Sequence, residues 1–199
     1  MKIKMELISD AIFGNGASIP GGEDIAVLSD EYGFPYYKGG TFKGVFREEL
    51  NRYLNWTGLS KEEIENKVTE LLGKSGDDSA VEEHKLVFSD FCISDAVKEC
   101  VIEETGQDNP QEILDSLTHL RTFTSISEDG MVENGSLRMG RCVNKGLCFY
   151  SNISCRQEDG ELVKEVLSLI KWIGTMRNRG FGKVKISVAE QGENDDGIY

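Results

Sequence analysis

Apolar side chains recur at every second position near both ends of the chain, and this alternation limits the folds that the chain can form. Residues 2–9 and 183–189 each carry three apolar side chains in this pattern. Because successive side chains of a strand point to opposite faces, both segments are predicted to be strands with one buried face. A third alternating segment, residues 147–155, follows an Asn-Lys-Gly turn and is also predicted to be a strand.

Helical periodicity marks several segments between these strands. Residues 41–54 have apolar side chains three and four positions apart after Thr41, a favourable N-cap, and residues 60–72 open with a capping box. Further helices are predicted over residues 110–120 and 161–173, a buried strand over 85–93, and β-structure from 121 onward. The core order of strand, helix, strand, strands, helix and strand predicts an α+β sheet of ferredoxin-like type, which is also the scaffold of the RNA-recognition fold.

Negative charge is concentrated in the middle of the chain. The net charge is −13, and residues 61–120 carry 16 acidic against 5 basic side chains. Proteins that bind nucleic acid gain affinity from phosphate contacts, so the total charge argues against that class. An acidic insertion that faces away from RNA would remove the objection, because the remaining chain is nearly neutral. Residues 192–199 form an acidic tail that we expect to be disordered.

The cysteines and the hydropathy pattern exclude several other classes of protein. The five cysteines contain no Cys-x-x-Cys pair, which argues against a disulfide framework and a zinc ribbon, so we expect free, buried thiols. No apolar run approaches the roughly 20 residues of a membrane span, and the charged N-terminus does not fit a signal peptide. We therefore expect a cytoplasmic protein with no membrane partner.

Residues 39–47, Gly-Gly-Thr-Phe-Lys-Gly-Val-Phe-Arg, are a candidate phosphate site. Two glycines lead into a predicted helix, whose first amides and dipole favour an anion. Lys43 and Arg47 lie four positions apart on one helical face. The candidate phosphate contacts here are Gly40, Thr41, Lys43 and Arg47. The alternative is an ordinary loop and helix with two solvated cations.

Residues 177–185 form a local basic patch, with cations and no acid. Glycines on both sides of Phe181 allow the backbone to approach a ligand closely, and an exposed aromatic ring there can stack on a base. The alternative is a tight turn with Phe181 in the core. The candidate RNA contacts are Arg177, Arg179, Gly180, Phe181, Gly182 and Lys183.

Residues 21–24, Gly-Gly-Glu-Asp, place two carboxylates in a loop rich in small residues. Asp24 is a candidate for acid–base catalysis or for holding a magnesium ion through water, and a solvated loop charge is the alternative. His84 and His119 share no motif with a nucleophile, and we interpret both as structural or solvated.

Together, these motifs resemble the RAMP superfamily of CRISPR-associated proteins, especially the repeated backbone subunit of type III effector complexes. That family has a Gly-Gly-x-Asp loop, a Pro-Tyr pair, a Gly-Ser-Ser-x-Lys-Gly-x-x-Arg helix start and an Arg-Gly-x-Gly turn, which correspond here to residues 21–24, 35–36, 40–47 and 179–182. The chain departs from the pattern at Thr41 and Phe42, at Lys183 in place of a common Arg, and over residues 121–141, which lack an expected Asp-Arg pair.

The resemblance implies one RAMP domain over residues 1–191, with a helical, acidic insertion at about 55–120 and a β-hairpin thumb at about 121–141. It implies that the subunit binds a guide crRNA, a complementary target RNA, other effector subunits and further copies of itself, with Arg121 among the RNA contacts. It also implies that Asp24 cuts the target RNA with Mg²⁺ or another divalent metal. The alternatives are a RAMP subunit that only scaffolds, an endoribonuclease that processes the guide and commonly uses a His, and an acidic protein-interaction module.

Overall fold

The computed structural model describes residues 1–14, 23–74, 85–105, 109–124, 127, 129–131 and 135–189. Its strands are β1 (Lys2–Leu7), β2 (Val87–Phe88), β3 (Thr118–Phe123), β4 (Arg138–Val143), β5 (Cys148–Ser154) and β6 (Val184–Val188). Its helices are α1 (Gly39–Trp56), α2 (Lys61–Leu72), α3 (Asp95–Thr105), α4 (Pro110–Leu117) and α5 (Gly160–Leu169), with short 3-10 turns at Gln157–Asp159 and Arg177–Arg179.

The central sheet has the strand order β2-β5-β1-β6, and all its neighbouring strands are antiparallel. Strand β1 lies inside the sheet, where Lys4 is opposite Tyr150 of β5 and Ser187 of β6. The alternating side chains of β1 divide as the sequence predicts, because Ile3, Met5 and Leu7 are buried while their neighbours are partly exposed.

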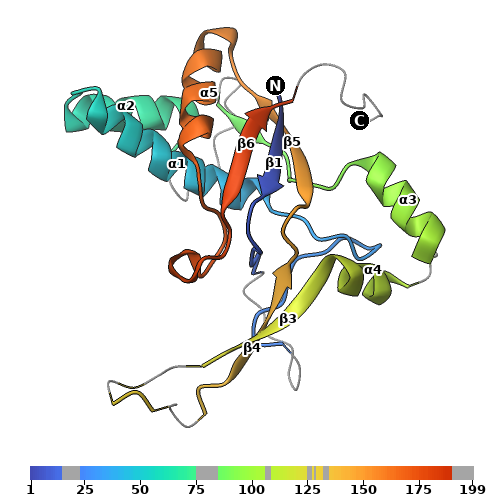
Figure 1. The fold of residues 1–199 in the computed structure, drawn as a ribbon. Helices are drawn as coiled ribbons and strands as arrows, with labels where there is room; N and C mark the ends of the chain where they lie inside the picture. The colour runs from blue at the N-terminus through green and yellow to red at the C-terminus, as the bar shows by residue number, and fades with distance from the viewer. Residues whose placement is uncertain are drawn as a thin grey trace.

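Helices α1, α2 and α5 lie together on one side of this sheet (Figure 1). They bury apolar side chains against β1, β5 and β6 in one core, including Phe46 and Leu50 of α1 and Val166 of α5. Burial of such a side chain contributes about 1.5–3 kcal/mol, so the helical layer and the sheet stabilise each other.

Strands β3 and β4 form a separate two-stranded hairpin that projects away from the central sheet (Figure 1). Its register pairs Thr118 with Val143 and Phe123 with Arg138. The predicted thumb at 121–141 is therefore a hairpin that begins three residues earlier. An antiparallel bridge between Ala11 and Val143 and a parallel bridge between Ile25 and Gly140 connect it to the N-terminal part of the chain.

Helix α1 begins at Gly39, two residues before the predicted cap Thr41, so that prediction is wrong. Lys38 is the N-cap residue, but its side chain makes no capping hydrogen bond. Instead, the Asp90 carboxylate accepts a hydrogen bond from the Gly39 amide at 2.8 Å. A Cβ atom at Gly39 would lie 2.3 Å from the Phe88 carbonyl oxygen. Glycine at position 39 thus permits close contact between the helix start and the segment after β2.

The segment expected to be an insertion, residues 55–120, contributes partly to the core. Helix α2 has the predicted capping box at Ser60 and buries Ile64, Val68, Leu71 and Leu72 in the main core. The predicted strand at 85–93 is reduced to β2, which pairs with β5. Helix α3 was not predicted, and none of its residues is buried. Helix α2 and strand β2 are therefore part of the folded core, and the orientation of the acidic insertion relative to RNA stays a prediction. The predicted tail at 192–199 lies outside the described residues.

All five cysteines are free thiols, as predicted, but only Cys142 is buried. Cys100 is exposed, and the other three are intermediate in burial. Among the described helices, none is long and apolar enough to cross a membrane.

Candidate functional site

Asp24 is fixed beside strand β4 by hydrogen bonds from both its backbone and its side chain. Its amide donates to the Met139 carbonyl at 2.8 Å, and its Oδ2 accepts from the Met139 amide at 2.7 Å. The next residue, Ile25, continues the contact by accepting a hydrogen bond from the Arg141 amide at 3.0 Å. Asp24 is exposed, so the fold presents its carboxylate to solvent at the hairpin.

A buried ion pair holds the residue before Asp24. Arg141 of β4 is 6% exposed and Glu23 is 8% exposed. The Arg141 Nε donates to Glu23 Oε1 at 2.6 Å, and another guanidinium nitrogen donates to Asp115 of α4 and to Thr118. Burial alone would lower the pKa of Arg141, but the hydrogen bonds to Glu23 and Asp115 raise it. The guanidinium stays charged and joins the Asp24 loop, α4 and the hairpin.

Phe181 lies in the core, so the prediction of an exposed stacking platform is wrong. It is 5% exposed and packs with Ile12 and Cys142. The Phe123 ring meets it edge-on, with centroids 5.7 Å apart, and the Arg121 guanidinium lies 5.4 Å from its ring centroid. A cation over an aromatic face is attracted to it, so Phe181 supports the exposed Arg121 at the hairpin.

The glycines of the C-terminal turn differ in what they allow. A Cβ atom at Gly182 would lie 1.9 Å from the Ile173 carbonyl oxygen, while one at Gly180 would meet no atom within 4 Å. Both residues have positive φ, 76° at Gly182 and 85° at Gly180. Gly182 also donates to Asp10 and accepts from Ile173. The turn therefore needs glycine at 182 for close packing, whereas its cations Arg177, Arg179 and Lys183 are exposed.

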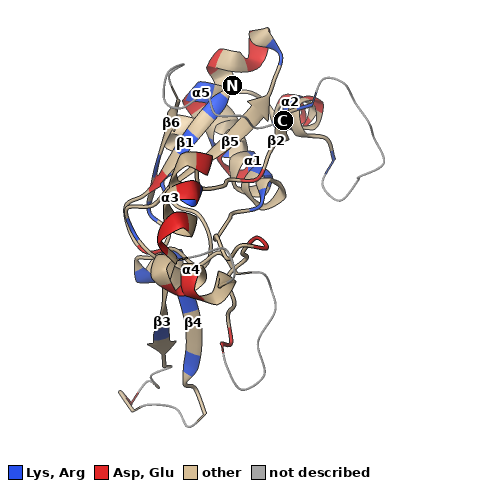
Figure 2. Cartoon of the chain, turned by 90° about the vertical axis from the view of Figure 1, so that its right-hand side faces the viewer, with Lys and Arg blue, Asp and Glu red and all other residues tan. Residues whose placement is uncertain are grey.

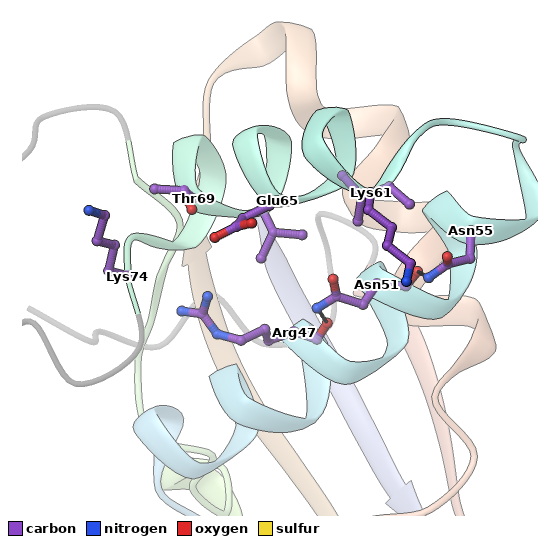
Figure 3. A pocket seen from close by; sticks show the side chains of 9 residues that line it. Arg47, Asn51, Asn55, Lys61, Glu65, Thr69 and Lys74 are labelled. Carbon is purple, nitrogen blue, oxygen red and sulfur yellow. Dashed lines mark hydrogen bonds between the residues drawn. The ribbon is translucent and has the colours of Figure 1, made fainter.

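Arg47 has a structural role that the sequence did not indicate. Its guanidinium donates to the carbonyl oxygens of Gly73 at 2.9 Å and Leu72 at 3.1 Å. These carbonyls end α2 and lack partners within the helix, so Arg47 caps α2. It lies in a groove of about 630 Å³ between α1 and α2 (Figure 3), which is also lined by Asn51, Asn55, Lys61, Ile64, Glu65, Val68, Thr69 and Lys74.

The other candidates of the first motif lie in the first turns of α1. Gly40 and Thr41 are exposed, and Lys43 is intermediate in burial. Asp90 already supplies a negative charge at this helix N-terminus, where the dipole favours one. The predicted phosphate site therefore includes a carboxylate from the chain itself.

Contacts between neighbouring residues bring the three motifs close together. Asp24 bonds to β4, and Arg121 of β3 lies over Phe181 of the C-terminal turn. Tyr37, which precedes α1, is buried, and burial raises its pKa, while its hydrogen bond with Gly174 and the charge of Arg177 lower it. The loop, the hairpin, the C-terminal turn and the entry to α1 thus form one continuous region. Arg138 of β4 is exposed and also belongs to this region. Its position opposite Phe123 of β3 could not be inferred from the sequence alone.

Asp24 can serve as a single protein ligand for a magnesium ion, but the described residues around it do not supply a complete set of metal ligands. Among the described residues, no group of three or more His, Cys, Asp or Glu side chains could hold a metal ion. Magnesium in proteins often keeps several waters and uses one or two carboxylates together with substrate phosphates. An exposed carboxylate fits that mode, with Asp24 as the protein ligand.

His119 has contacts that fit a structural role. His119 has its Nδ1 at 2.6 Å from Asn144 Oδ1 and its Nε2 at 3.6 Å from Asp10 Oδ2. These contacts agree with its interpretation as structural. His84 lies outside the described residues.

The model of the RAMP superfamily matches residues 4–185. The chain belongs to the RAMP superfamily. This RAMP protein is similar to a chain of the Type III-B Cmr-beta bound to cognate target RNA, with a TM-score of 0.64 and 13% identity over 93% of this chain and 95% of that one. It is also similar to a chain of the apo Type III-B Cmr-beta, with a TM-score of 0.63 and 14% identity over 96% and 97%. No curated protein sequence matches it. The predicted family and α+β fold are confirmed.

Proposed function

We propose that this RAMP protein is a guide-RNA-binding backbone subunit of a type III CRISPR effector complex, and that it cuts the bound target RNA at Asp24. The observation that carries the proposal is the placement of Asp24, which is exposed and is hydrogen-bonded through both backbone and side chain to Met139 of β4. The similarity in fold to chains of Type III-B Cmr-beta structures supports the kind of complex.

Exposed cations near Asp24 supply contacts for an RNA backbone. Arg121 and Arg138 lie on the two strands of the hairpin, and Arg179 lies on the adjoining turn. Such side chains bind phosphate without reading sequence. Base pairing between guide and target carries the specificity, so the protein needs only to hold the backbone and its shape.

Cleavage of RNA requires few protein groups, because the nucleophile is the 2′-hydroxyl of the RNA itself. The 2′-oxygen of one nucleotide attacks the adjacent phosphorus, its bond to phosphorus forms, and the bond from phosphorus to the 5′-oxygen breaks. Asp24 accepts the proton of the 2′-hydroxyl directly or through water, and water protonates the leaving 5′-oxygen. A divalent metal, when bound, would neutralise charge on the phosphate.

The decisive experiment compares Asp24→Asn with Glu161→Gln in the assembled, guide-loaded complex. Glu161 is an exposed carboxylate on α5, in the helical layer. We expect Asp24→Asn to bind complementary RNA as the unmodified complex does and to lose regularly spaced cutting by at least about a hundredfold, as is typical for removal of a proton-transfer group. Chelation of divalent metal should reproduce this loss, and Glu161→Gln should cut normally.

Two outcomes would contradict the proposal. Cutting at the normal rate by Asp24→Asn would mean that the subunit only scaffolds. Absence of bound RNA from the unmodified complex would favour a protein-interaction module instead.

A further inference from the structure

The face of the central sheet that points away from α1, α2 and α5 carries a group of polar and basic side chains. The helices bury one set of alternating residues, and the other set remains on the opposite face (Figure 1). We refer to this set as the open face. From β1, β5 and β6 it contains Lys2, Lys4, Glu6, Cys148, Tyr150, Asn152, Ser154, Lys185 and Ser187.

An aromatic ring lies among the lysines of the open face. The Nζ atoms of Lys2 and Lys4 are 5.5 Å and 6.0 Å from the centroid of the Tyr150 ring. Lys4 is directly opposite Tyr150 in the β1–β5 register and opposite Ser187 in the β1–β6 register. Lys185 lies on the same face, opposite Glu6.

The charge of this face is opposite in sign to that of the protein. In β1, β5 and β6 the open face has three lysines and one acidic residue, Glu6. The whole chain, by contrast, has a net charge of −13. A polyanion is therefore the complementary ligand.

We propose that the open face is a second RNA-binding surface, which holds a single-stranded segment apart from the site at Asp24. In this proposal the ammonium groups of Lys2 and Lys4 move from the Tyr150 ring to the flanking phosphates, where Lys185 also binds, and a base stacks on the ring in their place. An aromatic ring on a four-stranded sheet with basic neighbours has the features by which proteins hold single strands with little regard to sequence. The hairpin that carries Asp24's partner Met139 projects away from this sheet, so the two surfaces are separate (Figure 1).

A protein partner fits the open face less well than RNA does. The cores of protein interfaces are depleted in lysine and enriched in several large apolar side chains. Here lysine is the commonest residue, and the large uncharged side chains are limited to Tyr150 of β5 and the exposed Val87 of β2, which lies opposite Ser154.

The test uses the full chain and labelled oligouridine, with affinity measured by fluorescence anisotropy over a range of salt concentrations. Tyr150→Leu should weaken binding by roughly tenfold, which corresponds to the loss of one stacked base, and Tyr150→Phe should retain it. Lys4→Gln and Lys185→Gln should each flatten the log–log salt dependence by roughly 0.7. Ultraviolet crosslinking should label the peptide that contains Tyr150.

The matched control is Lys164→Gln, which removes a lysine from α5 in the opposite layer. Equal loss in this control, unchanged affinity in the open-face variants, or crosslinks confined to the hairpin would overturn the proposal. A change in sedimentation without a change in RNA affinity would overturn it too, and would identify the face as a contact between protein chains. The result does not depend on cutting, because Asp24→Asn should give the same crosslink at Tyr150.

Discussion

At the scale of single residues, the buried pair of Arg141 and Glu23 decides where Asp24 lies. Glu23 precedes Asp24 in the chain, and both residues are tied to β4, one through the Arg141 side chain and one through the Met139 backbone. Two attachments at adjacent positions restrict the loop where it meets the hairpin. In the proposed cutting reaction, a carboxylate held in this way would need little reordering, which is how positioned groups accelerate a reaction.

Replacing Arg141 should therefore damage stability more than a surface change would. Arg141→Met leaves the Glu23 carboxylate buried without its partner, and we expect the free energy of unfolding to fall by about 3 kcal/mol. Glu23→Gln combined with Arg141→Met should recover part of this loss, because the unpaired charge is removed. Urea unfolding of the two single variants and the double variant measures the coupling. Additive losses would show that the pair is not coupled.

At the scale of elements, Arg47 connects the end of α2 to α1. Arg47→Gln removes two charged hydrogen bonds to the carbonyls of Leu72 and Gly73, and we expect it to lower the free energy of unfolding by roughly 1–3 kcal/mol. Arg52→Gln on the same helix is the control, since the Arg52 side chain is 59% exposed, and it should change stability by less than about 0.5 kcal/mol. Equal unfolding midpoints for the two variants would contradict this capping role.

The hairpin strands β3 and β4 should carry salt-dependent binding of the guide–target RNA. Arg121→Gln and Arg138→Gln each remove one exposed cation, so each should reduce the slope of log affinity against log salt by roughly 0.7–0.9. Binding should weaken similarly for unrelated guide sequences, because these residues contact phosphate. Filter binding of the loaded complex with two unrelated guides measures both effects. A loss restricted to one guide would indicate base recognition instead.

Periodicity in the sequence predicts the elements that bury one face, and it misses those that do not. Helices α2 and α5 and strands β1, β5 and β6 each have a buried stripe, and all were predicted. Helix α3 fully buries no residue, although Val101 and Ile102 pack partly against the core, so its apolar stripe is too short to distinguish the helix in the sequence. Strand β2 has two residues, too few for a pattern.

Within the candidate site, the sequence identifies residue types but not long-range partners. Asp24 was predicted as a candidate from its loop motif. Its contact with Met139 and the pairing of Glu23 with Arg141 each join residues more than a hundred positions apart. Spacing along the chain carries no information about such contacts without the fold. The two possible roles of Phe181, in the core or stacked on a base, also differ only in the tertiary structure.

At the scale of the whole molecule, charge is distributed unevenly. Acidic side chains gather on α3 and α4, while basic ones mark the hairpin strands β3 and β4 (Figure 2). The net charge of −13 therefore describes no single surface of this RAMP protein. Fields of opposite sign at separate places allow one molecule to attract RNA to one surface and to repel it from another.

Several carboxylates make the stability of the whole molecule sensitive to acid. Hydrogen bonds from Ser60 lower the pKa of Glu63, those from Arg156 and Lys67 lower that of Glu70, and those from Arg141 and Gln111 lower that of Asp115. A lowered pKa in the folded state means that the unfolded chain binds more protons as pH falls. These groups therefore stabilise the protein above their ordinary pKa values, and this contribution is lost as pH falls below about 4.5 through their lowered values.

Urea unfolding at a series of pH values from neutral to about 3 tests this expectation. The free energy of unfolding should fall through the acidic part of the series, and Asp115→Asn should make that fall less steep. A stability that is constant down to the lowest pH would contradict it.

Gly182 has a consequence for how the Arg-Gly-x-Gly signature is understood. The Ile173 carbonyl fills the space where a side chain at 182 would begin, and the backbone there has a φ of 76°. Selection for folding alone would preserve such a glycine in a descendant that no longer touched RNA. Drift in that descendant would first remove the arginines at 177 and 179. Among homologues that all keep Gly182, the presence or absence of arginine at 177 and 179 would then distinguish proteins that still bind RNA from proteins that only fold.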